Sequence, residues 1–296
     1  MTENSSIAVT VLNNKQPKLK GLLGYLGLER YAKPIVTILH LEGVIGKVSM
    51  RSGLTIDSLN KKIEDAFAPK RLAAVCIIIN SPGGSPAQSE LIAKRIIALT
   101  KEKKVPVYAF VQDIAASGGY WLACAADKIY AANNSIIGSI GVVSAGFGFV
   151  EALKKLGVER RVHYQGNNKS ILDPFKPEQQ SDIDILMKLQ KQIHHNFISY
   201  VKSRRGSYLT QSDEILFNGE FWTADIAKDF GLIDGIDDLY SFIENEYGDK
   251  VELKYIAQKE SWIRRKIGLS FLAKDIVDEI SGKIDEKIIE NNLKLF

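Results

Sequence analysis

The sequence predicts an α/β fold in which short apolar strands alternate with amphipathic helices. The segment Ala73–Ile79 is a nearly continuous apolar run, which is typical of a strand buried on both faces of a sheet. Other apolar runs rich in β-branched residues are each followed by a stretch with helical spacing, a pattern that favours repeated strand–turn–helix units. With 296 residues the chain is long enough to bury a full core.

Composition excludes several classes of protein. Apolar and charged residues make up 45% and 25% of the chain, as in an ordinary globular protein. The net charge of +4 comes from well-mixed lysine, arginine, aspartate and glutamate, so no nucleic-acid partner is expected. Cys76 and Cys124 lie among apolar or small residues and are expected to be buried free thiols. Because the histidines and cysteines show no metal-ligand spacing, we expect no metal, and nothing in the chain indicates a cofactor.

The strands and helices expected in the first half of the chain follow from these patterns. Pro34 precedes a β-branched run that predicts the first strand. The expected strands are Ile35–Leu41, Ala73–Ile79, Val105–Val111 and Lys128–Ala132. The expected helices are Ser58–Ala68, Ala87–Lys101 and Ala115–Ala126.

The second half of the chain predicts more helix. We expect helices at Phe149–Leu156, Pro177–Arg204, Thr223–Phe230 and Leu239–Glu246, with a strand at Arg160–Tyr164 and a hairpin at Leu216–Trp222. The charged stretches Trp262–Ile267 and Lys274–Lys294 are expected to be helical. These patterns divide the chain into a lead-in at 1–33, a main domain at 34–246 and a charged helical extension at 247–296.

One hydroxyl stands out between small residues, at the point where a strand passes into a helix. Ser117 lies between two alanines and two glycines, so that a substrate or another backbone segment can approach it closely. Nucleophilic serine enzymes place their serine in this way, with the N–H of the next residue beside it. Taken alone, the residue type favours the N-cap of a tightly packed helix, because serine is a preferred cap residue.

A second motif, Ser81-Pro-Gly-Gly84, directly follows the buried strand. Glycines at the end of a strand can turn backbone N–H groups toward a developing oxyanion, although such a motif is also an ordinary turn. The residues do not identify a base for Ser117. Histidine and lysine are both known partners of a nucleophilic serine, and the chain offers many lysines.

The two motifs belong to an ordered set. Further along the chain stand Ile137-Gly-Ser-Ile-Gly-Val142, Lys169-Ser170 with Asp173-Pro-Phe175, and Glu220-Phe-Trp-Thr-Ala224. In this order and at this spacing the set resembles the signal peptide peptidase A (SppA) family of serine peptidases, over about Pro34 to Leu239. Ala224 stands where many members of the family have glycine.

The resemblance implies a Clp/crotonase-like fold, a spiral of ββα units, and a Ser/Lys dyad that hydrolyses peptide bonds. By motif, Ser117 is the nucleophile and Lys169 the general base. The oxyanion hole maps to Gly118 and to Gly83 or Gly84, and the sequence leaves open which of these two donates. The resemblance to the family also implies a homo-oligomeric ring in which neighbouring subunits share each active site.

Two other functions stay open from the sequence. A crotonase-type acyl-CoA enzyme would share the fold and an oxyanion hole but would not need a Ser–Lys pair. A non-catalytic ring-forming scaffold would keep the fold alone.

The expected substrate is a peptide, with cleaved signal peptides as one class. No apolar run of about 18 residues and no apolar segment typical of a secretory signal is present, so we expect a cytoplasmic protein. Gly21–Leu28 and Trp262–Ile267 are candidates for peripheral contact with the inner membrane face, against the alternative of ordinary surface packing.

Overall fold

The computed structural model describes residues 33–48 and 51–256. The strands are β1 (Ile35–Glu42), β2 (Lys47–Val48), β3 (Arg51–Ser52), β4 (Leu72–Ser81), β5 (Val107–Ala116), β6 (Lys128–Ala131), β7 (Ile136–Gly138), β8 (Phe221–Thr223), β9 (Gly235–Ile236) and β10 (Glu252–Tyr255). The helices are α2 (Ile56–Ala66), α3 (Pro86–Lys103), α4 (Gly118–Ala123), α5 (Val150–Leu156), α6 (Gln180–Arg205), α7 (Asp213–Leu216), α8 (Ala224–Asp229), α9 (Leu239–Tyr247) and the 3₁₀ turn η2 (Gly248–Lys250).

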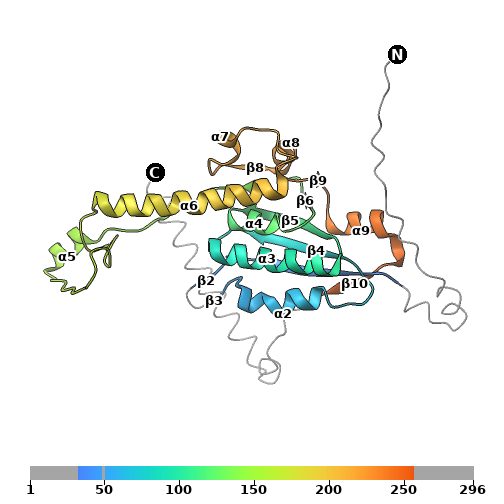
Figure 1. Ribbon diagram of the computed structural model, residues 1–296, viewed down its shortest axis with the longest axis horizontal. Helices are drawn as coiled ribbons and strands as arrows, with labels where there is room; N and C mark the ends of the chain where they lie inside the picture. Colours follow the sequence, from blue (N-terminus) through green and yellow to red (C-terminus); the bar gives the residue numbers. More distant parts are fainter. Residues whose placement is uncertain (1–32, 49–50, 257–296) are drawn as a thin grey trace, which may run out of the picture. The chain divides into compact units, whose positions relative to one another are not determined.

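Eight of the strands form one sheet. Six of them lie in the order β10-β1-β4-β5-β6-β9, and each neighbouring pair is parallel (Figure 1). Parallel neighbours need crossover connections, and helices supply them. This arrangement confirms the α/β class.

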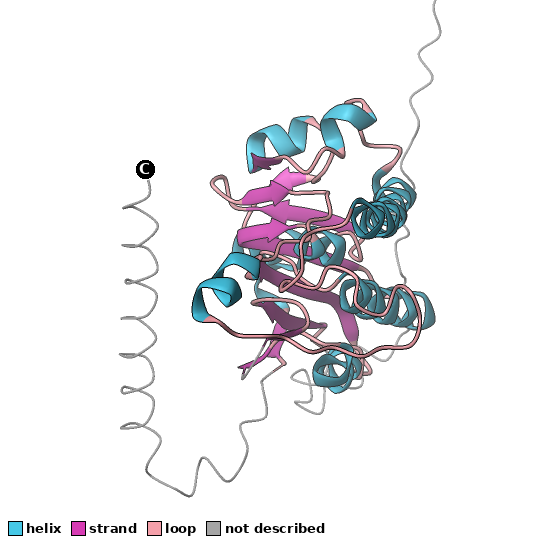
Figure 2. Cartoon of the chain, turned by 90° about the vertical axis from the view of Figure 1, so that its left-hand side faces the viewer, coloured by secondary structure: helices cyan, strands magenta, loops and turns pink. Residues whose placement is uncertain are grey.

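Helices cover both faces of the sheet. One core packs α2, α3, α4 and α6 against one face through residues such as Ile63, Ile96 and Val201. Figure 2 shows a row of helices, viewed nearly end-on, along one side of the strands. A smaller core packs α9 against the opposite face through Phe242 and Ile243. Because β4 is covered on both faces of the sheet, its residues are apolar almost throughout.

Local sequence sets where two of these helices begin. Thr55 and Ser58 form a reciprocal capping box at the start of α2. Ser85 caps α3, and Pro86 occupies the first helical position, where its missing N–H costs nothing. The start of α3 therefore lies directly after the Ser-Pro-Gly-Gly turn.

The strand β5 changes partners along its length. Tyr108–Val111 pairs with β6, and Ile114–Ala116 pairs with β7, which in turn pairs antiparallel with β8. The two exposed residues between them, Gln112 and Asp113, mark the change, and the Asn80 amide donates to the Asp113 carboxylate at 2.6 Å. One strand thus pairs with two different strands along the same edge, and it leads directly into α4.

Four expectations from the sequence are wrong within the described residues. Ala115–Ala126 is not one helix, because Ala115 and Ala116 belong to β5 and α4 covers only Gly118–Ala123. Arg160–Tyr164 is not a strand, because it has no neighbouring strand to pair with and its residues are exposed. Leu216–Trp222 is not a hairpin: its first residue ends α7, and its last two belong to β8, which pairs with β7. Residues 252–255 are not helical but form β10, whose alternating side chains fit an edge of the main sheet beside β1.

The main sheet therefore extends beyond the domain boundary expected at residue 246. The expectations for 1–32, including Gly21–Leu28, and for Trp262–Ile267 and Lys274–Lys294 lie outside the described residues.

Candidate active site

Ser117 occupies a strained turn between β5 and α4. Its backbone has φ 51° and ψ −121°, a conformation that costs a non-glycine residue about 1–3 kcal/mol and persists only when its surroundings hold it. The Ser117 N–H donates to the Gly138 carbonyl of β7 at 2.8 Å, and the Ser117 carbonyl accepts from Trp121 N–H at 3.0 Å. Ser117 stands at the N-cap position of α4, but its hydroxyl makes no capping hydrogen bond. The half-buried hydroxyl is thus left available for chemistry.

The Ser-Pro-Gly-Gly turn lies against Ser117. A Cβ atom added to Gly83 would come within 2.8 Å of the Gly118 nitrogen and 2.9 Å of the Ser117 Cβ. A Cβ atom added to Gly119 would likewise lie only 2.2 Å from the carbonyl oxygen of Ser81. The two motifs therefore meet at backbone contact distance, and only glycine leaves room for this approach.

The backbone N–H groups of the turn have different partners. The Gly83 N–H donates to the Ser81 hydroxyl at 3.2 Å, and the Gly83 carbonyl accepts from Ile45 N–H at 2.8 Å. In the part of the chain that the structure describes, no acceptor contacts the Gly84 or Gly118 N–H. Gly84 is exposed, and Gly118 is the first residue of α4, where helical N–H groups lack a partner within the helix.

Lys169 lies elsewhere in the same chain. It is exposed, and among the described residues no hydrogen bond joins it to Ser117. Its loop is held near the start of α6, since Leu172 N–H donates to Asp182 at 3.1 Å. Figure 1 shows α5 and this loop extending beyond the first residues of α6, away from α4.

The other end of α6 contacts α4. Trp121 stacks on Phe197, with ring centroids 4.7 Å apart. At 1.5 Å per residue, Asp182 and Phe197 are about 22 Å apart along the helix. One chain therefore brings Ser117 to its glycines but does not bring Lys169 to Ser117.

Among the residues described, no histidine is hydrogen-bonded to Ser117. His194 bonds the Ile140 carbonyl at 3.0 Å, and His40 pairs with Glu42 at 2.6 Å in β1. In the described ranges, no group of three or more histidine, cysteine or acidic side chains lies close enough together to hold a metal ion. Cys124 is buried and free, and burial raises its pKa to about 12, so it is a poor nucleophile.

Several residues that shape the site carry no obvious sequence signal. Ile45 pairs with Gly84 across an isolated bridge, and the side chain of Ile45 lies 3.2 Å from an added Cβ on Gly118. Ser89, fully buried in α3, has its hydroxyl 2.5 Å from that same position. These contacts join segments far apart in the sequence, which is why spacing alone does not reveal them.

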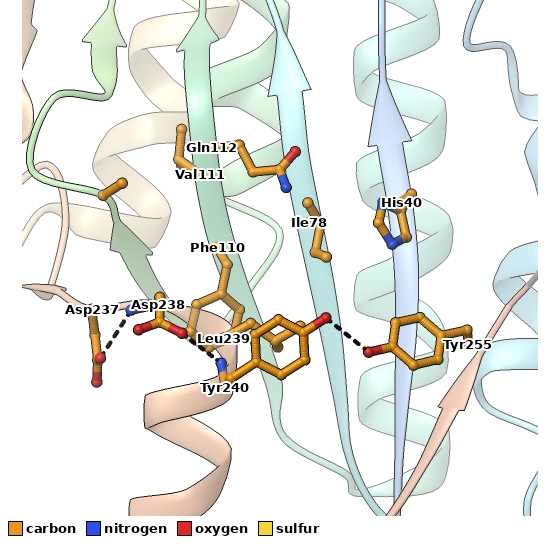
Figure 3. Close-up of a pocket in the computed structure, with 11 residues that line it drawn as sticks. His40, Ile78, Phe110, Val111, Gln112, Asp237, Asp238, Leu239, Tyr240 and Tyr255 are labelled. Atoms are coloured by element: carbon orange, nitrogen blue, oxygen red, sulfur yellow. Dashed lines mark hydrogen bonds between the residues drawn. The ribbon is translucent and has the colours of Figure 1, made fainter.

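A shallow hollow lies on the α9 side of the sheet. It has a volume of about 220 Å³, and its lining includes Phe110, Leu239 and the two tyrosines Tyr240 and Tyr255, whose hydroxyls are 3.0 Å apart (Figure 3). Phe110 and Leu239 belong to the core on the face opposite α4. This hollow is thus separate from the Ser117 turn.

Comparison with known proteins gives a consistent result. The sequence model described as peptidase family S49 matches residues 99–254. The chain is 31% identical over 176 residues to an Enterococcus faecium protein named for signal peptide peptidase SppA, covering 60% of this chain and 50% of that one. It is 32% identical over 208 residues to a Synechocystis protein named as a protease, covering 67% and 73%.

Higher identity is found to a protein with a different name. The chain is 49% identical over 253 residues to a Brucella melitensis protein named Na⁺/H⁺ antiporter NhaA, and the match covers 84% of this chain but 34% of that protein. The chain therefore spans about a third of the length of that relative. In the described residues, no helix is both long enough and apolar enough to cross a bilayer.

Proposed function

Because the chain belongs to peptidase family S49, we propose that it is a serine endopeptidase with Ser117 as nucleophile and Lys169 as general base. One observation carries the proposal. The hydroxyl of the strained Ser117 makes no capping hydrogen bond, and it lies beside two backbone N–H groups that have no acceptor in the described structure. A purely structural N-cap would use its hydroxyl to bond the first turn of the helix.

The Gly84 and Gly118 N–H groups form the proposed oxyanion hole. Both are free of other acceptors among the described residues, whereas the Gly83 N–H is already bonded to the Ser81 hydroxyl. The role of Gly83 is instead steric, because its lack of a side chain lets the turn approach Ser117 closely. Donors held in place before the reaction stabilise the oxyanion without reorganisation.

The proposed base comes from a second copy of the chain. Lys169 is exposed and separated from Ser117 within one chain, and a lysine can take a proton only when it is uncharged, a state that burial favours and water does not. The segment between β7 and α6 exposes large apolar side chains, with Val143 86%, Phe147 83% and Leu156 74% exposed. Large apolar side chains exposed within one segment are typical of an interaction site, and this supports an oligomer in which the segment inserts beside a neighbouring Ser117.

The reaction then proceeds by acyl transfer. Uncharged Lys169 takes the Ser117 proton as Oγ bonds to the peptide carbonyl carbon, and the carbonyl electron pair moves to the oxygen held by the two N–H groups. The C–N bond breaks, and the departing nitrogen takes the proton from Lys169. A water molecule then gives a proton to Lys169 as its oxygen bonds to the ester carbonyl carbon. The bond from that carbon to Ser117 Oγ breaks, and Lys169 returns the proton to Oγ, so that the acid product leaves and the Ser117 hydroxyl is restored.

Peptides, including cleaved signal peptides, are the proposed substrates, and a cytoplasmic location stays a prediction. The test is hydrolysis of a fluorogenic peptide panel by the wild type, Ser117→Ala and Lys169→Ala, with Lys101→Ala in α3 as a control for loss of an exposed lysine. We expect both dyad variants to lose activity by about 10³-fold or more, and the control to retain it.

Mixing the two inactive variants tests the shared site. If subunits exchange, a mixed oligomer contains some sites with both Ser117 and Lys169, and activity should return. Full activity of Lys169→Ala would refute its role as base. A wild type that forms the oligomer yet cleaves no peptide and reacts with no serine-directed acylating probe would favour the non-catalytic scaffold.

A further inference from the structure

Three buried carbonyl groups just beyond the end of α4 share one donor, the guanidinium of Arg204 in α6. Its Nε donates to the Cys124 carbonyl at 2.8 Å, and its Nη2 donates to the carbonyls of Ala125 at 3.3 Å and Ala126 at 2.9 Å. These three residues are at most 5% exposed, and in the described chain no other group donates to their carbonyls. Because a buried acceptor without a donor is costly, the end of α4 depends on this one side chain.

Charge also suits Arg204 to this position. The carbonyl end of a helix carries partial negative charge, and a guanidinium stays protonated, so these hydrogen bonds are charge-assisted. The Asp127 carboxylate is a more distant partner, 3.8 Å from Nη2, and its other oxygen accepts from Val107 N–H at 2.9 Å. The main partners of Arg204 are therefore the carbonyls at the end of α4.

The opposite end of the same helix carries the proposed nucleophile. Trp121 N–H donates to the Ser117 carbonyl, and Cys124 N–H donates to the Tyr120 carbonyl, both at 3.0 Å. With six residues, α4 is about 9 Å long and has fewer than two turns, so it moves as one unit. The positive φ of Ser117, 51°, persists only where its surroundings hold it. A displacement at the end of α4 therefore also displaces the Ser117 hydroxyl.

The other contacts between α6 and α4 are less directional. Trp121 stacks on Phe197 and Tyr200, with ring centroids 4.7 and 5.0 Å apart and interplanar angles of 22° and 16°. Nearly parallel rings hold the two helices side by side (Figure 1) but can slide over one another, whereas a hydrogen bond requires both distance and angle. Among the contacts from α6, the Arg204 hydrogen bonds therefore fix α4 along its own axis.

We propose that Arg204 is a positioning residue for the reaction at Ser117. By holding the far end of α4, it keeps the Ser117 hydroxyl and the Gly118 N–H in place beside the Ser-Pro-Gly-Gly turn. The proposal rests on the peptidase function proposed above. It adds a residue that acts through α4 rather than by touching the reacting atoms.

Replacing the guanidinium tests the proposal. Arg204→Met keeps an unbranched stem but no donor, and a misplacement of about half an ångström should lower kcat by at least about tenfold. KM should change by less than about threefold, because the lost interaction does not involve the substrate. Arg204→Lys keeps the charge and reaches part of the carbonyl cluster, so it should recover much of the lost kcat. Arg204→Gln, with one neutral donor group, should show the same loss of kcat at similar KM, and it replaces Arg204→Met if that variant does not fold.

Arg95 provides a matched control. Its guanidinium also joins two helices, since it donates from α3 to Asn60 at 3.0 Å and to Glu64 at 2.7 Å in α2. Its side chain is 34% exposed, against 26% for Arg204. Arg95→Met and Arg204→Met should both lower the thermal midpoint, whereas only Arg204→Met should lower kcat per reactive Ser117. Wild-type kcat in Arg204→Met, or an equal loss of kcat in Arg95→Met, would overturn the proposal.

A measurement without catalysis separates this proposal from the peptidase activity. Amide hydrogen exchange of residues 117–123 in the full-length protein should accelerate in Arg204→Met but not in Arg95→Met. Accelerated exchange with unchanged kcat would mean that Arg204 only stabilises the helix, and would overturn its positioning role. If the wild type cleaves no peptide, the peptidase proposal fails, and the rate at which a serine-directed acylating probe labels Ser117 takes the place of kcat in the same comparison.

Discussion

Replacing Gly83 by alanine should damage catalysis far more than folding. An added Cβ would lie 2.8 Å from the Gly118 nitrogen, 2.9 Å from the Ala116 carbonyl oxygen and 2.9 Å from the Ser117 Cβ. Ordinary contacts of this kind begin near 3.4 Å, so the turn and the Ser117 backbone must separate by about half an ångström. Active sites need their groups within about 0.5 Å of the productive geometry.

The cost to activity follows from this displacement. Misplacement of about 1 Å lowers the rate of a positioned reaction by roughly 10²-fold, and loss of one oxyanion donor lowers kcat by about 10²–10³-fold. We therefore expect kcat for Gly83→Ala to fall by about 10²-fold with a much smaller change in KM. Acylation of Ser117 by a serine-directed probe should slow in parallel.

Gly43→Ala is the control for backbone strain. Gly43 has φ 100°, close to the 103° of Gly83, but an added Cβ there has no atom within 4 Å. Both substitutions should reduce stability by about 1–3 kcal/mol through the positive φ, which thermal unfolding measures. Only Gly83→Ala should lose activity. Wild-type kcat in Gly83→Ala, or an equal loss in Gly43→Ala, would show that close contact of the turn with Ser117 is not required.

Three further predictions concern stability and reactivity. Tyr120→Phe should cost about 1–3 kcal/mol in denaturant unfolding, because the fully buried hydroxyl donates to the Leu232 carbonyl at 2.7 Å and that carbonyl would lose its partner; an unchanged midpoint would contradict this. Cys124, whose pKa burial raises to about 12, should not react with iodoacetamide at pH 8 until the protein unfolds, as peptide mass spectrometry would detect. The hydrogen bond from Arg160 lowers the pKa of Asp173, so this pair stabilises its loop above the ordinary aspartate pKa of about 4 and loses that effect as pH falls through the lower folded value. Protease cleavage of the loop should increase with acidification in the wild type but not in Asp173→Asn, and equal profiles would refute the role of the pair.

The hydrophobic pattern was sufficient to predict the strands and helices that bury one face or both faces in a core. The strands β1, β4 and β6 and the helices α3 and α6 lie where apolar runs and helical spacing predict them. Each of these segments packs into a core, so the spacing of its apolar residues indicates which side is buried. The predicted α/β class follows from the same patterns.

Segments whose structure depends on a distant partner were predicted less well. Arg160–Tyr164 has a strand-like composition, but no strand lies beside it to satisfy its backbone. Residues 252–255 form a strand because β1 offers a free edge, which no local pattern in a charged segment reveals. The β8 strand exists because β7 pairs with it from more than eighty residues earlier in the chain.

The candidate site divides in the same way. The sequence by itself indicated the chemistry proposed for the site, because Ser117, the glycine pairs and the Lys169 loop stand in the order of a serine peptidase family. Only the tertiary structure decided how they meet: it brings Gly83 against Ser117, leaves the Gly84 and Gly118 N–H groups without acceptors in the described chain, and holds the Lys169 loop beside the far end of α6. The physical reason is that residue type specifies reactivity locally, whereas backbone approach and hydrogen-bond direction depend on strands and helices that pair across long sequence separations.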